Sequence, residues 1–185
     1  PFGDHPTFTE ARHSAEELQE LMDEARKAGT VNPEAAEIAT RALDLPELKA
    51  ADVMVPRQDV MMLPVDSSFE ELKDALLERP HSRIPLYRDN VDNVVGYVNT
   101  RDVLARLLQQ HAVSLAELLR EPYFVPASKH IVELLREMRE RRMLLAIVVD
   151  EAGGTAGIVT MEDLVEELVG DIFSEYVKGV HPLIE

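Results

Sequence analysis

The sequence has 185 residues, of which 45% are hydrophobic and 29% are charged, and its formal net charge at pH 7 is −16. This charge argues against nucleic acids and anionic membrane surfaces as partners, because both would be repelled. The sequence contains no Cys, which excludes disulfides, thiolate metal sites and a cysteine nucleophile. No apolar run approaches the ~20 residues that a membrane-spanning helix requires.

Residues 1–48 are predicted to form an acidic helical lead-in, with eleven Asp and Glu against four Lys and Arg. Ser14 and Glu17 have the spacing of a capping box, which predicts a helix to about Gly29. Asn32 followed by Pro33 predicts the start of a second helix. The acidic residues allow two interpretations, a solvated helix face or a surface that senses divalent cations.

The remaining sequence contains two copies of one pattern, about sixty residues apart. Each copy predicts a short strand, a helix, two further strands and a closing helix. In the first copy the two later strands are residues 83–87 and 94–98, joined by a polar turn. In the second copy they are residues 144–149 and 156–159, joined by a Gly-rich turn. The closing helices carry apolar residues at matching positions: Val103, Leu104, Leu107 and Leu108 in the first, and Leu164, Val165, Leu168 and Val169 in the second.

This order predicts an α+β fold in which two β-α-β-β-α repeats pack sheet against sheet about a pseudo-twofold axis. We expect the lead-in at residues 1–48, the first repeat at 49–112, the second at 113–176, and a C-terminal tail at 177–185.

Both copies place a polar residue three positions before an Asp, directly after the last strand. The pairs are Asn99 with Asp102 and Thr160 with Asp163. These residues have an ordinary structural interpretation as helix caps and first-turn acids. The same arrangement also suits a nucleotide, since the carboxylate can accept ribose hydroxyls and the helix start can bind phosphate.

Three runs of sequence give the chain a family resemblance. Met54 to Arg57, His81 to Tyr87 and Ile147 to Glu167 together resemble the CBS pair, or Bateman module, of CorC/HlyC-type magnesium and cobalt efflux proteins, relatives of the CNNM transporters. The resemblance extends over about residues 14–176. It implies a regulatory fragment of a larger protein, located at the cytoplasmic face of the cell membrane and attached to a transmembrane domain outside this sequence.

The resemblance also implies a homodimer formed through the CBS pairs, which binds ATP, with Mg²⁺ held through the ATP phosphates, to control transport. Asp163 would bind ribose and Thr160 would contact phosphate, while Val55 and Pro56 would pack near the base. The stretch His81, Ser82, Arg83, Ile84 and Pro85 would flank the base and phosphates. The family often has Thr at the position of Val55, so one hydroxyl contact is missing here. Asn99 and Asp102 form a possible second site.

Two arginines are candidates for the positive charge that a polyphosphate requires in such an acidic protein, Arg57 and Arg83. Each is otherwise interpreted as a solvated or locally paired residue. His81 is expected to lie at a pocket edge rather than to bind metal, because no second His or Cys stands at ligand spacing.

Other functions remain open. The same fold could sense AMP or another adenosine derivative for a different effector, or it could be a purely structural dimerisation module. An enzyme is not expected, because the sequence has no P-loop, no Gly-x-Ser-x-Gly elbow and no His pair at zinc spacing.

Overall fold

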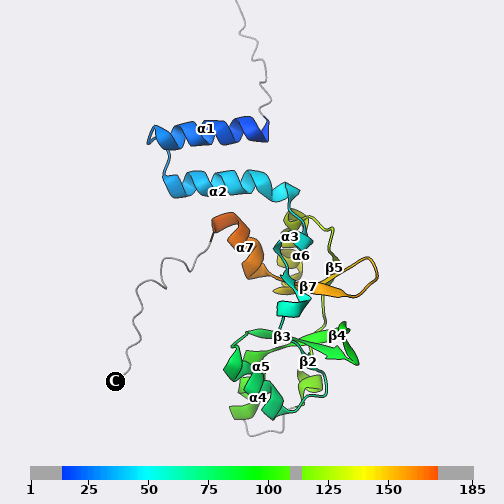
Figure 1. Ribbon diagram of the computed structural model, residues 1–185. Helices are drawn as coiled ribbons and strands as arrows, with labels where there is room; N and C mark the ends of the chain where they lie inside the picture. Colours follow the sequence, from blue (N-terminus) through cyan, green and yellow to red (C-terminus); the bar gives the residue numbers. More distant parts are fainter. Residues whose placement is uncertain (1–13, 109–113, 171–185) are drawn as a thin grey trace, which may run out of the picture. The chain divides into compact units, whose positions relative to one another are not determined.

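The computed structural model describes residues 14–108 and 114–170, which separate into two units (Figure 1). One unit comprises the described residues up to Leu45 and from Leu168 onward, and the other comprises residues 46–167. The predicted tail at 177–185, the first thirteen residues of the lead-in and the last residues of each predicted repeat lie outside the described residues.

The first unit contains a helical hairpin of α1 (Ala15–Lys27) and α2 (Pro33–Asp44). The predicted capping box is confirmed, since the amide of Glu17 donates to Ser14 Oγ at 3.3 Å and the amide of Ser14 donates to Glu17 Oε2 at 3.2 Å. Asn32 Oδ1 likewise caps α2. None of the described residues of α1 is buried, so the hairpin has too little core to be stable alone.

The second unit contains both copies of the repeat. The first copy and the segment before it form α3 (Ala50–Val53), β1 (Val55–Pro56), β2 (Leu63–Pro64), α4 (Phe69–Glu78), β3 (Arg83–Arg88), β4 (Asn90–Asn99) and α5 (Thr100–Leu108). The second copy forms β5 (Phe124–Pro126), α6 (Ile131–Arg141), β6 (Leu145–Val149), β7 (Thr155–Thr160) and α7 (Met161–Val169). Short 3₁₀ helices lie at η1 (Leu45–Glu47), η2 (Arg57–Asp59) and η3 (Leu115–Leu118). The predicted order of strands and helices is confirmed in both copies.

Each copy builds one sheet, in the orders β2-β3-β4 and β1-β7-β6-β5. In both, the first strand is parallel to the second and the second is antiparallel to the third. The additional strand β1 precedes the first copy in sequence but pairs antiparallel with β7 of the second sheet. The sequence pattern did not predict this pairing of β1 with the sheet of the other copy, which we call the exchange of β1.

The core lies on both faces of the first sheet. Between that sheet and its helices α4 and α5 (Figure 1), Leu72, Ile84, Leu86, Val98, Val103 and Leu115 are all buried. Val94 and Tyr97 of β4 pack against Leu145 and Ile147 of β6. The two sheets therefore pack face to face, as the repeat predicted.

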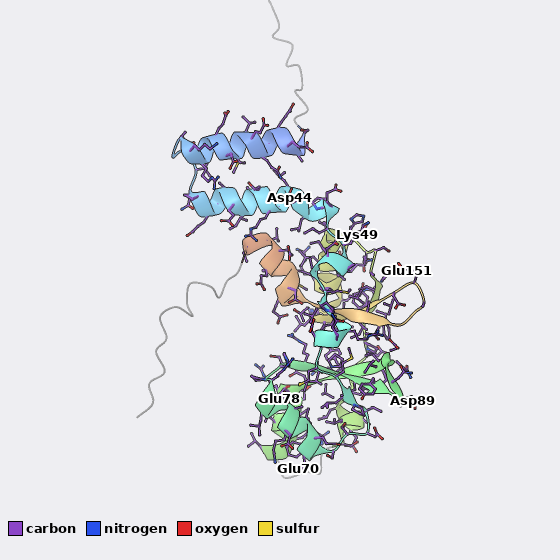
Figure 2. All side chains as sticks on the ribbon, in the orientation of Figure 1. Asp44, Lys49, Glu70, Glu78, Asp89 and Glu151 are labelled. Carbon is purple, nitrogen blue, oxygen red and sulfur yellow. The ribbon has the colours of Figure 1, made fainter. Side chains whose placement is uncertain are left out.

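The two hairpin turns, marked by Asp89 and Glu151 in Figure 2, differ from each other. The predicted Gly-rich turn is present, with Asp150 Oδ1 accepting hydrogen bonds from the amides of Ala152 and Gly154. The polar turn predicted for the first copy, from Arg88 to Asn93, is wrong, because β4 already begins at Asn90. Asp89 makes the turn alone, with a left-handed φ of 66°, and the next four residues form an exposed polar strand end.

Candidate functional site

A cleft of about 390 Å³ lies where the two copies meet, and we call it the Asp163 cleft. Four segments form it: the chain from β1 to Met61, the loop from α4 into β3, the first residue of β6, and the end of β7 with the start of α7. Its lining residues are Val55, Asp59, Val60, Met61, Pro80, His81, Ser82, Arg83, Pro85, Leu145, Ile158, Thr160, Glu162 and Asp163.

Most of the residues predicted for a nucleotide site lie in this cleft. Val55, Ser82, Pro85 and the others quoted above line it, with two exceptions. Ile84 is fully buried in the core, because its side chain points to the opposite face of β3. Pro56 is exposed and pairs with Gly157 at the sheet edge.

Thr160 and Asp163 form a capping box at the start of α7. One carboxylate oxygen, Asp163 Oδ2, accepts hydrogen bonds from the amide and the hydroxyl of Thr160, each at 2.7 Å. The amide of Asp163 donates in return to Thr160 Oγ1 at 3.2 Å. Within the described residues, Asp163 Oδ1 has no hydrogen-bond partner in the structure. The capping interpretation therefore describes Asp163 correctly, and the cap uses only one of its two carboxylate oxygens.

Arg83 supplies the cleft with positive charge from the start of β3. Its side chain is only 13% exposed, and Nη1 donates to the two carboxylate oxygens of Glu162 at 3.1 and 3.4 Å. Glu162 is 63% exposed, so this carboxylate can swing away at low cost. Arg57, the other predicted cation, does not line the cleft and is paired with Asp92 instead.

The loop before β3 is held in place by Thr100, the first residue of α5 in the same copy. Thr100 Oγ1 donates to the carbonyl of His81 at 2.6 Å, and the amide of Thr100 donates to the carbonyl of Ser82 at 3.0 Å. These bonds fix the backbone of the loop and leave its side chains to face the cleft.

Comparison with known proteins identifies the family to which the chain belongs. The profile of the CBS domain matches residues 50–109 and 115–170, one segment for each copy of the repeat. The chain belongs to the CBS domain family. Its two copies are therefore CBS motifs, and the resemblance stated from the sequence is confirmed.

Named relatives extend this result. The chain is 41% identical over 140 residues to hemolysin C of Brachyspira hyodysenteriae, covering 76% of this chain and 52% of that protein. It is 34% identical over 163 residues to the magnesium and cobalt efflux protein CorC of Pasteurella multocida, covering 87% of this chain and 54% of that protein. The chain thus spans about half the length of these curated relatives.

Solved structures of CBS domains are similar as well. The CBS domain of a bacterial CNNM/CorC-family Mg²⁺ transporter, in complex with an inhibitor, is 36% identical with a TM-score of 0.78, covering 87% of this chain and all of that one. The CBS domain of a transporter of this family in complex with ATP is 37% identical with a TM-score of 0.72, covering 76% and 100%. A CBS pair from Klebsiella pneumoniae with bound AMP is 30% identical with a TM-score of 0.58, covering 66% and 99%.

The second predicted pair of residues, in the first CBS motif, is arranged differently. Asn99 lines another cleft of about 690 Å³ with Arg101, Leu104 and Leu144, but Asp102 does not. This cleft shares the residues from Pro80 to Arg83 with the Asp163 cleft. Asp102 Oδ2 instead accepts hydrogen bonds from Arg120 Nη2 at 2.5 Å and Nε at 3.1 Å. Asp102 and, more weakly, Tyr97 raise the pKa of the Arg120 guanidinium above its ordinary value.

Several cleft residues were not predicted from the sequence. Ile158 and Leu145 come from strands whose cleft-facing positions follow from pairing register rather than from composition. Asp59 and Met61 reach the cleft because η2 turns the chain back after β1. The sequence shows that Glu162 is adjacent to Asp163. It does not show that Glu162 pairs with Arg83 of the other motif.

Two further observations concern the described part of the chain. It contains no group of three or more His, Cys, Asp and Glu side chains arranged to hold a metal ion. None of its helices is both long enough and apolar enough to cross a membrane.

Proposed function

We propose that this chain is the nucleotide-binding regulatory module of a CorC-type Mg²⁺/Co²⁺ efflux transporter, and that it binds ATP with Mg²⁺ in the Asp163 cleft. Binding would control transport by a membrane domain that is attached to this module. In this proposal the module lies at the cytoplasmic face of the cell membrane. The carrying observation is that Asp163, Thr160 and Arg83 line one cleft in a chain similar to a CBS domain solved with ATP.

The shape of the cleft supports a small nucleotide. Its volume of about 390 Å³ falls in the range of about 300–1,000 Å³ that is typical of ligand pockets. Val55, Met61 and Ile158 provide an apolar wall against which an adenine ring can pack. Asp163 Oδ1 is the acceptor for the ribose hydroxyls, and the capping box holds its carboxylate in position before ligand arrives.

The charges in the cleft support magnesium as a companion of the phosphates. Arg83 is the cation placed to contact them, while Asp59 and Glu162 line the same cleft. Bare triphosphate would meet two carboxylates in a protein of net charge −16. A bridging Mg²⁺ lowers that repulsion, so we expect chelation of Mg²⁺ to weaken ATP binding in calorimetric titrations.

The decisive test uses Asp163→Ala and measures melting temperature with and without saturating Mg²⁺-ATP. Loss of the capping box lowers the stability of the unliganded protein by roughly 1 kcal/mol. Loss of charged hydrogen bonds to ribose, on the order of 1.5–3 kcal/mol, reduces ATP affinity at least tenfold and abolishes most of the ATP-induced upshift.

Glu71→Ala is the matched control, because Glu71 closes a capping box with Ser68 on α4 and does not line the cleft. It should lower the melting temperature in the same way and keep the full ATP-induced upshift. An Asp163→Ala protein that also keeps this upshift would show that Asp163 only caps α7. A wild-type protein without any nucleotide response would favour the structural dimerisation module.

AMP is a second candidate ligand. A similar CBS pair has been solved with AMP bound, and the pairing of Arg83 with Glu162 leaves little free positive charge for three phosphates. Competition between AMP and ATP for the cleft, each with and without Mg²⁺, separates these ligands. Tighter binding of AMP under both conditions would replace ATP in the proposal.

A further inference from the structure

The loops that lead into β3 and β6 hold the same place in the two CBS motifs, and we call them the β3 loop (residues 80–82) and the β6 loop (residues 142–144). In each motif, the first residue of the strand after the loop pairs with the last residue of the next strand. The same backbone hydrogen bond also closes both loops. The amide of Thr100 donates to the carbonyl of Ser82 at 3.0 Å, and the amide of Met161 donates to that of Leu144 at 3.1 Å.

The β6 loop is fastened to the helix that precedes it. Arg142 follows α6 with a left-handed φ of 56°, and its amide donates to the carbonyl of Arg139 at 3.2 Å. The amide of Met143 donates to the carbonyl of Met138 at 2.8 Å. These two bonds are those of a Schellman cap. The position of Met143 is therefore set by the end of α6.

The β3 loop leaves its helix without such a cap. Arg79, the residue after α4, has an extended backbone with φ −139° and ψ 103°. Pro80 has no amide hydrogen to donate. Within the described residues, no backbone hydrogen bond leads from His81 back to α4. His81, which corresponds to Met143, therefore lacks the anchor that holds Met143 in the other motif.

A side chain of α5 supplies an anchor in its place. Thr100 Oγ1 donates to the carbonyl of His81 at 2.6 Å. The corresponding residue of the second motif is Met161, which has no hydroxyl. The bond is thus an addition of the first motif, and it holds the loop whose residues Pro80, His81 and Ser82 line the Asp163 cleft.

We propose that Thr100 is a positioning residue for nucleotide binding, because its hydroxyl holds the β3 loop in the conformation that receives the ligand. Thr100 lines the larger neighbouring cleft and not the Asp163 cleft, so it acts on a nucleotide in the Asp163 cleft through the loop. A loop that is ordered beforehand strengthens binding, since the ligand does not have to order it. This inference rests on the proposed binding of nucleotide in the Asp163 cleft.

The test compares Thr100→Val, which removes the hydroxyl and keeps the shape of the side chain, with Thr100→Ser, which keeps a hydroxyl. Calorimetric titration with Mg²⁺-ATP should show an affinity roughly three- to tenfold lower in Thr100→Val, the equivalent of about one hydrogen bond. Thr100→Ser should bind as wild type does. Because His81 is exposed, water can replace the lost donor, so Thr100→Val should stay folded, which circular dichroism melting verifies.

A second measurement observes the loop itself, without nucleotide. The NMR order parameters of the His81 and Ser82 amides should fall in Thr100→Val from about 0.85, typical of rigid backbone, toward about 0.6. They should remain high in Thr100→Ser. Thr155→Val is the matched control, because the Thr155 hydroxyl also donates to a backbone carbonyl, that of Asp92 at 3.2 Å, and does not line the cleft. It should change neither the affinity nor these order parameters.

Three results would overturn the proposal. The first is a Thr100→Val protein whose loop is as ordered as that of wild type. The second is a Thr100→Val protein with a looser loop that binds Mg²⁺-ATP as tightly as wild type. The third is a folded Thr100→Ser protein that behaves like Thr100→Val. A wild type that does not bind Mg²⁺-ATP contradicts the proposed function, whereas the order parameters test the hold of Thr100 on the β3 loop independently of any ligand.

Discussion

At the scale of single residues, the cleft depends on which charges neutralise each other before a ligand arrives. Arg83 and Glu162 come from different CBS motifs and meet across the Asp163 cleft. The ligand phosphates would compete with Glu162 for the same guanidinium. We therefore expect this pair to influence the affinity of the cleft for anionic ligands.

Neutralising Glu162 should strengthen nucleotide binding. Glu162→Gln frees Arg83 from an exposed ion pair worth about 0.2–1 kcal/mol, so ATP affinity should rise by up to roughly fivefold. Isothermal titration measures the change. Asp92→Asn is the control, because it frees Arg57, which does not line the cleft. A decrease in affinity for Glu162→Gln would mean that Glu162 contacts the ligand or its Mg²⁺ directly.

Sequence reasoning was most successful where function depends on local spacing. The interval from Thr160 to Asp163 predicted a helix cap, which the observed capping box confirms, whereas the binding of ribose by Asp163 stays a prediction. It was least successful for partners distant in sequence. Arg57 with Asp92, and Arg120 with Asp102, are pairs that only strand register and turn geometry bring together.

At the scale of secondary-structure elements, β1 approaches β7 so closely that the stability of the fold should be sensitive to substitution there. A Cβ at Gly157 would clash with the Val55 carbonyl and lie 3.0 Å from Met54 Sδ. Gly157→Ala should therefore cost about 1–3 kcal/mol and loosen the strand that carries Val55. Urea denaturation measures the loss. Gly154→Ala, whose nearest neighbours are carboxylate oxygens at 3.3 Å, should cost clearly less, and equal losses would contradict this account.

A polar network ties α6 to the segment before β5. Glu137 accepts hydrogen bonds from the Tyr123 hydroxyl and, at 2.9 Å, from Lys129 Nζ. The Tyr123 hydrogen bond and then that of Lys129 lower the pKa of Glu137. Burial, followed by the Glu137 hydrogen bond, raises the pKa of Tyr123 to about 12. Arg141 lies over the Tyr123 ring, 4.9 Å from its centroid.

Because of this network, the stability of the protein should decrease as the pH falls. The lowered pKa means that ionised Glu137 stabilises the fold fully above its unfolded value of about 4.3, and the contribution is lost as pH falls through the folded value. The difference in melting temperature between wild type and Glu137→Gln should therefore shrink from pH 7 to pH 3. Glu133→Gln, an exposed position on the same helix, is the control. A constant difference for Glu137→Gln would refute the assignment.

At the scale of the whole molecule, part of the predicted apolar stripe stays uncovered in one chain. Leu104 and Leu108 of α5 are 52% and 86% exposed, and Val165 of α7 is 36% exposed, whereas Val103 and Leu164 are buried. The side chain of Leu107 lies outside the described residues. Uncovered apolar residues on two helices are suited to a self-complementary contact, which supports the expected homodimer.

Leu104→Glu should convert the homodimer to monomer, because it places a charge in the centre of that stripe. Light scattering coupled to size exclusion, at micromolar protein concentration, gives the mass of each species. Val91→Glu is the control, at a 40% exposed position on the β3–β4 hairpin, and it should remain dimeric. A wild-type protein that is monomeric would remove the basis of this prediction.

The exchange of β1 also has a kinetic consequence during synthesis of the chain. Val55 cannot find Ile158 until roughly a hundred further residues have left the ribosome, and pairings of such high contact order form slowly. The first motif therefore emerges with an unpaired edge segment, and the second sheet closes only when β7 arrives. The second sheet is therefore complete only after β7 has been synthesised, so a translation stop before Thr155 should leave the first motif aggregation-prone.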